Sequence, residues 1–396
     1  MSKKIAIIGQ GTAGVFALSH FHRYSKECEL ELYFDPNIKP QPVGEGSTLE
    51  FPIALEENLN FGFNDLEKID GSLKYGIRKN NWSTGKDYVH QFRAPMVSYH
   101  FNASKLQKYI LEKLEGEFKL IEKNVSSYDD IDADYIMDCA GRPKSYEDFN
   151  MLESIAVNSV HVNQCYWDYP RFNHTLTLAR PYGWVFGIPL KNRCSIGYLY
   201  NNNINTLEEV KDDIKNVFDE FNLTPSQDTN TFSFTSYYRE QNFSDRVAYS
   251  GNNSFFLEPM EATSIATMDW IQRKAFDVWF RGKVPLFANT EFSNFIKEIE
   301  NMIMLHYCNG SVFNTNFWEI SKQKAEKHLS NSLKNDDKLK MLIEQSKLDW
   351  NDIKRNPNIN PYLIYGTWQL SSIQQNITNL NLYEKLEQLE KMPKYY

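Results

Sequence analysis

The chain has 396 residues, of which 41% are hydrophobic and 24% charged, as in ordinary globular proteins with a large core. Its formal net charge of −8 disfavours a nucleic-acid partner, because binding a polyanion needs a basic surface. No apolar run approaches a membrane span, and the five cysteines lack the spacing of a disulfide framework or a zinc site. These features predict a cytoplasmic protein without a metal, long enough for two or three domains.

A β-α-β unit opens the chain. Residues 4–8 form a β-branched run typical of a buried strand, residues 13–24 have the spacing of an amphipathic helix, and residues 30–34 indicate a second strand. Between the first strand and the helix stands Gly9-Gln10-Gly11-Thr12-Ala13-Gly14, which matches G-x-G-x-x-G. This order predicts a doubly wound parallel sheet that binds a dinucleotide.

The glycines have separate tasks in such a site. Gly9 permits the tight turn, Gly11 lets the backbone approach a pyrophosphate, and Gly14 lets helix and strand pack closely. The first N–H groups of the helix would then face the phosphates. Asp35, at the end of the second strand and roughly 20 residues further on, is placed to accept hydrogen bonds from ribose hydroxyls.

The pattern changes along the rest of the chain. Alternation between residues 154 and 200 predicts antiparallel sheet, and helical spacing dominates from about residue 264. Asn102 is placed to cap one helix, and Thr206 with Glu209 forms a capping box for another. Further strands are expected at 135–137, 231–238 and 247–251.

Two later segments favour FAD over NAD as the dinucleotide. Asp138-Cys139-Ala140-Gly141 closes one strand, and Gly251-Asn252 follows another, where many FAD enzymes hold the ribityl chain with a Gly-Asp pair. Asn252 replaces that aspartate and can still hydrogen-bond hydroxyls. The sequence has no second G-x-G-x-x-G for NAD(P)H, so we expect the flavin to be reduced by a separate reductase.

Five segments, in order along most of residues 1–320, resemble the flavin-dependent tryptophan halogenase family. They are residues 43–48 (VGEGST), residues 71–77 (GSLKYGI) with Trp82 beyond, residues 181–189 (PYGWVFGIP), residues 258–264 (EPMEATS), and His306-Tyr307 followed by Asn316-Phe317-Trp318. Phe186 stands where the family has a second tryptophan, and Ala262 stands where serine is usual. The chain is also short for a halogenase of free tryptophan, so these departures put the substrate in question rather than the fold.

The resemblance implies an enzyme that uses FADH2, O2 and a halide to halogenate an electron-rich indole, phenol or pyrrole. Hypohalous acid made at the flavin would pass through a tunnel to Lys74, whose amine polarises it or forms a haloamine. Glu261 would stabilise the cationic ring intermediate and take its proton. In the structural alternatives, Lys74 is a surface lysine beside Arg78 and Lys79, and Glu261 only satisfies a helix dipole.

The family pattern also indicates the remaining site residues. The backbone N–H groups of Thr263 and Ser264, at a helix start, would hold the halide. Side chains on two strands would line the substrate pocket and separate it from the flavin, with Trp184 and Phe186 on one face of the first strand and Tyr88, His90 and Phe92 on one face of the second. The full predicted set is Trp184, Phe186, Ile188, Pro189, Tyr88, His90 and Phe92. Core packing is the alternative for the aromatic residues, and His90 and His306 could be ordinary structural histidines.

Together these observations predict an α/β fold with a FAD-binding Rossmann-like domain of the GR2 type, an inserted antiparallel-sheet substrate domain and a C-terminal helical region. The expected bounds are 1–150 and 241–285 for the two parts of the FAD-binding domain, 151–240 for the sheet and 286–396 for the helices. The expected cofactor-binding residues are Gly9, Gly11, Thr12, Ala13, Gly14, Asp35, Gly44, Glu45, Ser47, Gly141, Gly251 and Asn252. An FAD-dependent aromatic monooxygenase and an inactive FAD-binding protein stay open as alternatives.

Overall fold

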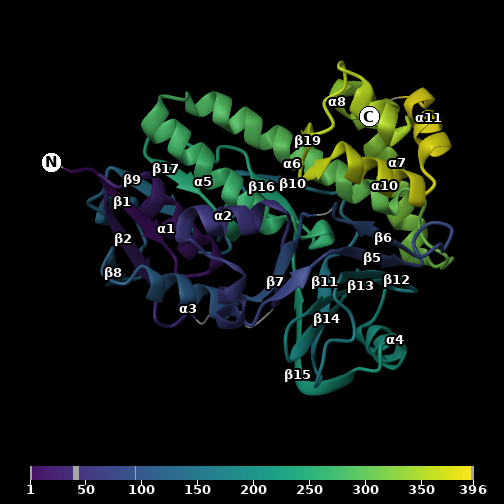
Figure 1. Cartoon of the computed structure of the whole chain (residues 1–396), viewed down its shortest axis with the longest axis horizontal. Coiled ribbons are helices and arrows are strands. Elements are labelled where there is room, and N and C mark those ends of the chain that lie inside the picture. The colour runs from purple at the N-terminus through teal and green to yellow at the C-terminus, as the bar shows by residue number, and fades with distance from the viewer. Residues whose placement is uncertain (1, 39–43, 94, 394–396) are drawn as a thin grey trace.

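The computed structural model describes residues 2–38, 44–93 and 95–393, so Val43 of the first family segment lies outside the described residues. Figure 1 shows a parallel sheet near the N-terminus, a larger sheet toward the middle and helices at the C-terminal end. The molecule is a mixed α/β fold, as the sequence predicts.

The parallel sheet has the strand order β17-β9-β1-β2-β8. Its strands are β1 (Lys4–Ile8), β2 (Glu29–Phe34), β8 (Lys119–Glu122), β9 (Tyr135–Asp138) and β17 (Val247–Tyr249). Ile5 and Ile7 of β1 are fully buried, as expected for a central strand covered on both faces. The strands expected at 4–8, 30–34 and 135–137 are confirmed.

Four helices accompany this sheet, with α1 packed against the other three. They are α1 (Thr12–Tyr24), α2 (Glu50–Leu59), α3 (Ala103–Lys113) and α5 (Ser264–Arg281). Helix α3 is capped by Asn102, whose Oδ1 accepts a hydrogen bond from the Lys105 N–H at 3.1 Å. Helix α5 follows β17 and returns to the parallel sheet, so a late stretch of the chain completes the first domain (Figure 1).

The seven-stranded sheet has the order β15-β11-β14-β13-β12-β5-β6. Its strands are β5 (Gly76–Asn80), β6 (Tyr88–Gln91), β11 (Ser159–Tyr166), β12 (Thr175–Arg180), β13 (Gly183–Pro189), β14 (Arg193–Tyr200) and β15 (Thr224–Ser233). All neighbours are antiparallel except β12 and β5. Strands β5 and β6 come from the first 150 residues, so the early chain contributes directly to this sheet.

One face of this sheet is covered by α4 (Leu207–Glu220), which buries Val210, Ile214 and Val217 against it. The predicted capping box is confirmed, because the Glu209 N–H donates to Thr206 Oγ1 at 3.2 Å and the Thr206 N–H donates to Glu209 Oε2 at 2.7 Å.

The single strand predicted at 231–238 is wrong. Strand β15 ends at Ser233, and β16 (Tyr237–Arg239) belongs to a separate sheet of order β10-β16-β18, with β10 at Phe149–Met151 and β18 at Phe255–Phe256. The Phe234 N–H still extends the pairing of β15 with β11, because it donates to the carbonyl of Asn158, just before β11, at 2.8 Å. Beyond it the backbone has other partners: the Ser236 carbonyl accepts from the Leu152 N–H at 3.0 Å, and β16 pairs with β10 and β18.

A three-stranded sheet, β3-β7-β4, joins the two large ones. Its strands are β3 (Gly44–Gly46), β7 (Ser98–Asn102) and β4 (Ser72–Lys74). Since β3 and β4 both pair with β7, the 44–48 segment and Lys74 are brought to the same part of the molecule.

The C-terminal third is mostly helical, as predicted. Its elements are α6 (Pro285–Tyr307), α7 (Asn316–Asn335), α8 (Asp337–Ser346), α9 (Trp350–Arg355), β19 (Ile364–Tyr365), β20 (Trp368–Gln369), α10 (Leu370–Asn379) and α11 (Tyr383–Lys391). Helix α10 packs on β6, so the C-terminal region reaches the edge of the large sheet. None of the helices in the described part of the chain combines the length and apolarity that a bilayer crossing requires.

Candidate functional site

The three glycines of the N-terminal motif have the environments that their predicted tasks require. Gly9 has φ +100, and a Cβ there would lie 2.5 Å from the Cys139 carbonyl oxygen. At Gly14 a Cβ would lie 1.8 Å from the Gly9 oxygen. At Gly11, by contrast, nothing lies within 4 Å of such an atom. The tight positions serve packing, and the open one leaves space for a phosphate beside the N-terminus of α1.

Two later glycines, Gly141 and Gly251, lie in the same region as the N-terminal motif. Gly251 has φ +60, and a Cβ there would lie 2.8 Å from the Cβ of Ala13, so the loop after β17 touches the first turn of α1. Gly141 has φ +97 and open space around it. Asn252 lies next to Gly251 in a 3-10 turn and is half-buried. Segments 110 residues and more apart in sequence thus form one cradle that fits a dinucleotide.

Asp35 directly follows β2 and is half-buried. Its Oδ1 accepts hydrogen bonds from the Asn37 N–H at 2.9 Å and from Asn37 Nδ2 at 2.8 Å, which fixes the carboxylate at the end of the strand. Gly44 and Glu45 lie in β3, where the backbone is described. Asp35 therefore lies at the end of the second strand, where a ribose-binding carboxylate is expected, while Gly44 and Glu45 lie in a strand that pairs with β7.

Replacing Gly11 by alanine is expected to weaken FAD binding about tenfold or more, a cost of about 1.4 kcal/mol, without changing the melting temperature. The backbone at Gly11 has φ −70, which alanine accepts, but the added methyl would occupy the space left for a phosphate. Titration of the apoprotein with FAD measures the affinity. The matched control is Gly14→Ala, which should lower stability as well because its Cβ overlaps the backbone.

Lys74 is not a surface lysine, because its side chain is fully buried. Its Nζ donates a hydrogen bond to the Ser47 carbonyl at 2.8 Å, and a Cβ at Gly46 would lie 3.8 Å from it. Burial lowers the pKa of Lys74 to about 8, with Glu261 opposing that shift and the charge of Lys79 adding to it. The amine is therefore available in its neutral form near neutral pH.

Glu261 lies close to Lys74 and has an unusual backbone. A Cβ at Gly46 would contact both Ala262 Cβ, at 3.4 Å, and Lys74 Nζ. Glu261 has φ 63 and Ala262 has φ 56, so two consecutive non-glycine residues are left-handed. Such residues cost of order 1–3 kcal/mol each, and they turn the Glu261 side chain into the protein interior. The surroundings of the carboxylate must offset this cost.

Three donors hold the Glu261 carboxylate, and His306 Nε2 also lies 3.2 Å from its Oε1. Its Oε1 pairs with the ammonium of Lys79, and its Oε2 accepts from Trp368 Nε1 at 2.9 Å and contacts His90 Nδ1 at 3.1 Å. Burial alone would raise the pKa of Glu261, but the Lys79 charge and His90 hold it well below its ordinary value. Glu261 is thus a buried, fully ionised carboxylate.

Lys79 is fully buried and makes three contacts that match its three N–H donors. It pairs with Glu261, contacts His306 Nε2, and donates to Asn376 Oδ1 at 3.0 Å. His306 Nδ1 lies 2.8 Å from the Met302 carbonyl, so Nδ1 carries the proton and Nε2 accepts. Burial lowers the pKa of Lys79, and Glu261 opposes that shift. Three acceptors around one amine indicate an ammonium ion.

The two glutamates of the 258–264 segment have opposite environments. Glu258 is also buried, but its neighbour is a hydroxyl: Tyr307 donates to its two oxygens at 2.9 and 3.0 Å. Burial raises the pKa of Glu258 to about 8, whereas that of Glu261 is lowered. Only Glu261 therefore supplies a negative charge at neutral pH.

Strand β13 carries the predicted partition residues. Trp184, Phe186 and Ile188 face the main core, and the intervening Val185 faces the smaller core under α4, as alternation requires. The Phe186 ring covers Gly197 of β14, where an added Cβ would lie 2.1 Å from it. Trp184 and Phe186 are therefore packed side chains on one face of the sheet, and a role in separating flavin from substrate stays a prediction.

The other predicted pocket residues lie on or next to β6. Tyr88 donates to Asn376 Oδ1 at 2.9 Å, and His90 contacts Glu261. Phe92 has its ring centre 5.6 Å from Lys74 Nζ and 6.0 Å from the His90 ring. Residues 88–92 thus lie beside the surroundings of both buried lysines, Lys74 and Lys79.

Thr263 precedes helix α5, which begins at Ser264. The Thr263 side chain is 1% exposed, and its Oγ1 has no hydrogen-bond partner among the described residues. A buried hydroxyl beside a helix N-terminus is a suitable donor for an anion. The residues present fit the predicted halide site.

Sequence reasoning missed four members of the Glu261 cluster: Lys79, His306, Asn376 and Trp368. The sequence does carry a signal for Lys79, since it lies two residues after the buried Ile77 on β5 and so points to the same, inward face. The sequence pattern alone names Lys79 only as a neighbour of Lys74, in the alternative where both lie at the surface. Trp368 and Asn376 lie beyond the family segments, and only the tertiary structure brings Trp368 to Glu261 and Asn376 to Lys79.

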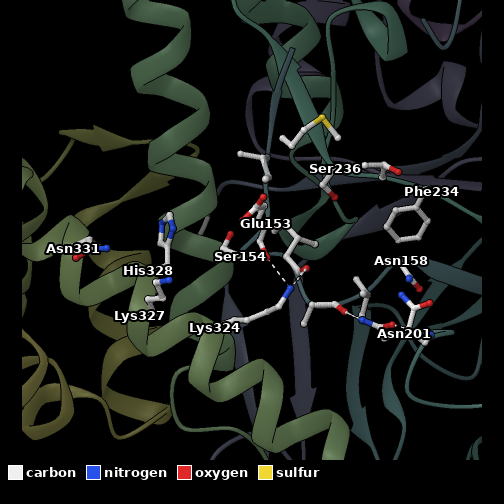
Figure 2. Close-up of a pocket in the computed structure, with 17 residues that line it drawn as sticks. Glu153, Ser154, Asn158, Asn201, Phe234, Ser236, Lys324, Lys327, His328 and Asn331 are labelled. Atoms are coloured by element: carbon white, nitrogen blue, oxygen red, sulfur yellow. Dashed lines mark hydrogen bonds between the residues drawn. The ribbon is translucent and has the colours of Figure 1, made fainter. Parts of the chain in front are cut away.

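A separate cavity of about 760 Å³ lies between α7 and the chain around residues 151–158 (Figure 2). Figure 2 shows Lys324 extending from α7 to the backbone, where its Nζ donates to the Glu153 carbonyl at 2.7 Å. Neither Lys74 nor Glu261 lines this cavity. It is therefore distinct from the cluster described above.

The tryptophan halogenase family profile matches residues 4–128 and 120–352. The tryptophan 6-halogenase SttH of Streptomyces toxytricini is 23% identical over 264 residues, which cover 58% of this chain and 49% of that protein. The chain thus matches about half the length of this curated relative.

Solved structures share the fold along nearly the whole chain. A tryptophan halogenase from Shewanella frigidimarina NCIMB 400 superposes with a TM-score of 0.76 at 16% identity, over 98% of this chain and 92% of that one. MibH, a lathipeptide tryptophan 5-halogenase, gives 0.80 at 15% identity, over 98% and 89%. BrvH, a flavin-dependent halogenase from Brevundimonas sp. BAL3, gives 0.76 at 16% identity, over 99% and 98%. On the evidence of its family profile, the chain belongs to the tryptophan halogenase family, whose members are flavin-dependent halogenases.

Proposed function

We propose that this protein halogenates an electron-rich aromatic compound of the indole, phenol or pyrrole class, with Lys74 and Glu261 at the reaction site. Bound reduced FAD would give two electrons to O2, and the halide would give the other two and so become hypohalous acid, with water as the second product. The observation that carries the proposal is the proximity of the buried Lys74 amine to the 261–262 segment. Lys74 Nζ and Ala262 Cβ both lie beside Gly46, and the buried Glu261 carboxylate is near enough for its charge to act on the pKa of Lys74.

The residues of the glycine cradle would hold the flavin, and Thr263 with Ser264 would hold the halide. Lys74 would receive the hypohalous acid, polarising it through a hydrogen bond or reacting with it as a neutral amine. The lowered pKa of Lys74 makes the neutral amine accessible. Glu261 would stabilise the positive charge that develops on the ring, because an ionised carboxylate attracts the intermediate more strongly than the uncharged substrate.

We further propose that a separate flavin reductase delivers the reduced cofactor. The reason lies in the chain itself: its G-x-G-x-x-G segment is used by the cradle at Gly9–Gly14, and the sequence has no second one for NAD(P)H. Oxidation of NADPH by the purified protein alone would favour the monooxygenase alternative.

The test is to supply the protein with a reductase, FAD, O2 and a panel of indoles, phenols and pyrroles. Mass spectrometry should show the chlorine isotope pattern on a product made with chloride and the bromine pattern with bromide. Oxygen addition in place of halogen would establish the monooxygenase, and bound FAD without any turnover would indicate an inactive flavin-binding protein.

A further inference from the structure

His90 has one ring nitrogen that is hydrogen-bonded and one without a partner among the described residues. It lies on β6 with 2% of its surface exposed, and its Nδ1 is 3.1 Å from Glu261 Oε2. Its Nε2 is buried and has no hydrogen-bond partner among the described residues. Several buried polar atoms of the described residues lack a partner, and this nitrogen is the one that belongs to a ring in direct contact with Glu261, so it is free to meet a group outside the chain.

The bond to Glu261 determines which nitrogen carries the proton. An ionised carboxylate only accepts hydrogen bonds, so His90 Nδ1 must be the donor. In the neutral imidazole, Nε2 then keeps its lone pair. A carboxylate that orients an imidazole in this way, leaving the far nitrogen as a base, is the arrangement found in hydrolase triads.

The polar atoms of the neighbouring Glu261 and His306 already have partners. Glu261 accepts from Lys79 and Trp368 in addition to His90, and the lone pair of His306 Nε2 faces Lys79. Contacts with two aromatic rings also fix the orientation of His90, with centroid distances of 5.9 Å to Trp368 and 6.0 Å to Phe92. Within this cluster, the His90 Nε2 lone pair is the proton acceptor without a partner in the described structure.

We propose that His90 is the catalytic base of the halogenation step, taking the proton from the ring carbon that has received the halogen. In this assignment Glu261 stabilises the positive charge of the ring, and His90, rather than Glu261, accepts the proton. This inference rests on the proposed function, because it assigns one step of that reaction.

The step balances without a further reactant. A π-electron pair of the ring forms the carbon–halogen bond, and hypohalous acid releases hydroxide. The C–H bond at the same carbon then breaks, its electron pair restores the aromatic ring, and its proton forms a new N–H bond at His90 Nε2. The proton finally combines with hydroxide to give water. Glu261 stabilises the imidazolium as well as the ring cation, since it contacts His90 directly.

The experiment compares His90→Asn and His90→Gln with the wild type, using substrate with hydrogen or deuterium at the halogenated carbon. Asparagine keeps a donor near the position of Nδ1, and glutamine places an amide near Nε2, but neither is a base. Halogenation should fall by about 10²–10⁴-fold in both variants. A primary isotope effect should appear, because C–H cleavage becomes the slow step. A soluble β-diketone that traps hypohalous acid should show unchanged oxidant production.

The matched control is His161→Asn, which replaces another buried strand histidine of the same sheet, bonded to Thr231 Oγ1 at 2.7 Å. It should halogenate at the wild-type rate without an isotope effect. Wild-type rates in a folded His90 variant, or reduced rates without an isotope effect in both, would overturn the assignment to His90. Absence of trapped oxidant in the wild type would instead refute the proposed function.

Discussion

Lys74→Met should lower aromatic halogenation by about 10²–10⁴-fold, the range expected for loss of a group that assists by proton donation or acceptance. Methionine keeps most of the volume of the buried side chain but has no amine to polarise hypohalous acid or react with it. The hydrogen bond to the Ser47 carbonyl is also lost, at a smaller cost in stability. Product formation is measured by mass spectrometry, with FAD binding measured on the same samples.

The control for this variant is Lys68→Met, which removes an exposed lysine paired with Asp65 and should leave the rate unchanged. Undiminished halogenation by a folded Lys74→Met protein would remove Lys74 from the reaction. Loss of FAD binding in this variant would mean that the lysine supports the cofactor site instead.

Lys79→Met should destabilise the folded protein by about 3–5 kcal/mol, because it leaves the buried Glu261 carboxylate without its cation. Urea unfolding measures the loss. The double variant Lys79→Met/Glu261→Gln should recover a large part of it, since no uncompensated charge then remains. If the double variant is no more stable than the single one, the ion pair does not account for the effect.

The same pair predicts how stability depends on pH. The pKa of Glu261 is lower in the folded protein than in the unfolded chain, where a glutamate titrates near pH 4.3. The folded protein therefore gains stability from this group above that pH, and loses it as the pH falls toward the folded-state pKa. Lys79→Met should reduce this acid dependence, which unfolding curves at several pH values would reveal.

The sequence was sufficient for features that depend on local pattern. The β-α-β unit, the cap at Asn102 and the capping box at Thr206 follow from periodicity and from side chains that bond within a few residues. Positions such as Gly9 and Gly14 could also be predicted, because the backbone of a dinucleotide turn restricts what fits there.

The Glu261 cluster could not be predicted in the same way, because it depends on long-range contacts. Trp368 and Asn376 come from the C-terminal region, over 100 residues after Glu261, and nothing local marks them as the partners of Glu261 and Lys79, respectively. The burial of Lys79 could not be predicted, because charged residues are rarely fully buried unless paired and its carboxylate partner is 182 residues away in sequence. The break between β15 and β16 likewise depends on backbone partners elsewhere in the chain.

The central claim is that the oxidant forms at the flavin and reacts at a separate place beside Lys74 and Glu261. Its most direct test is to measure trapped hypohalous acid and halogenated aromatic product together in the Lys74→Met reaction. We predict that trapped oxidant matches the wild-type yield while the aromatic product disappears. A variant in which oxidant and product vanish together would contradict the separation of the two sites.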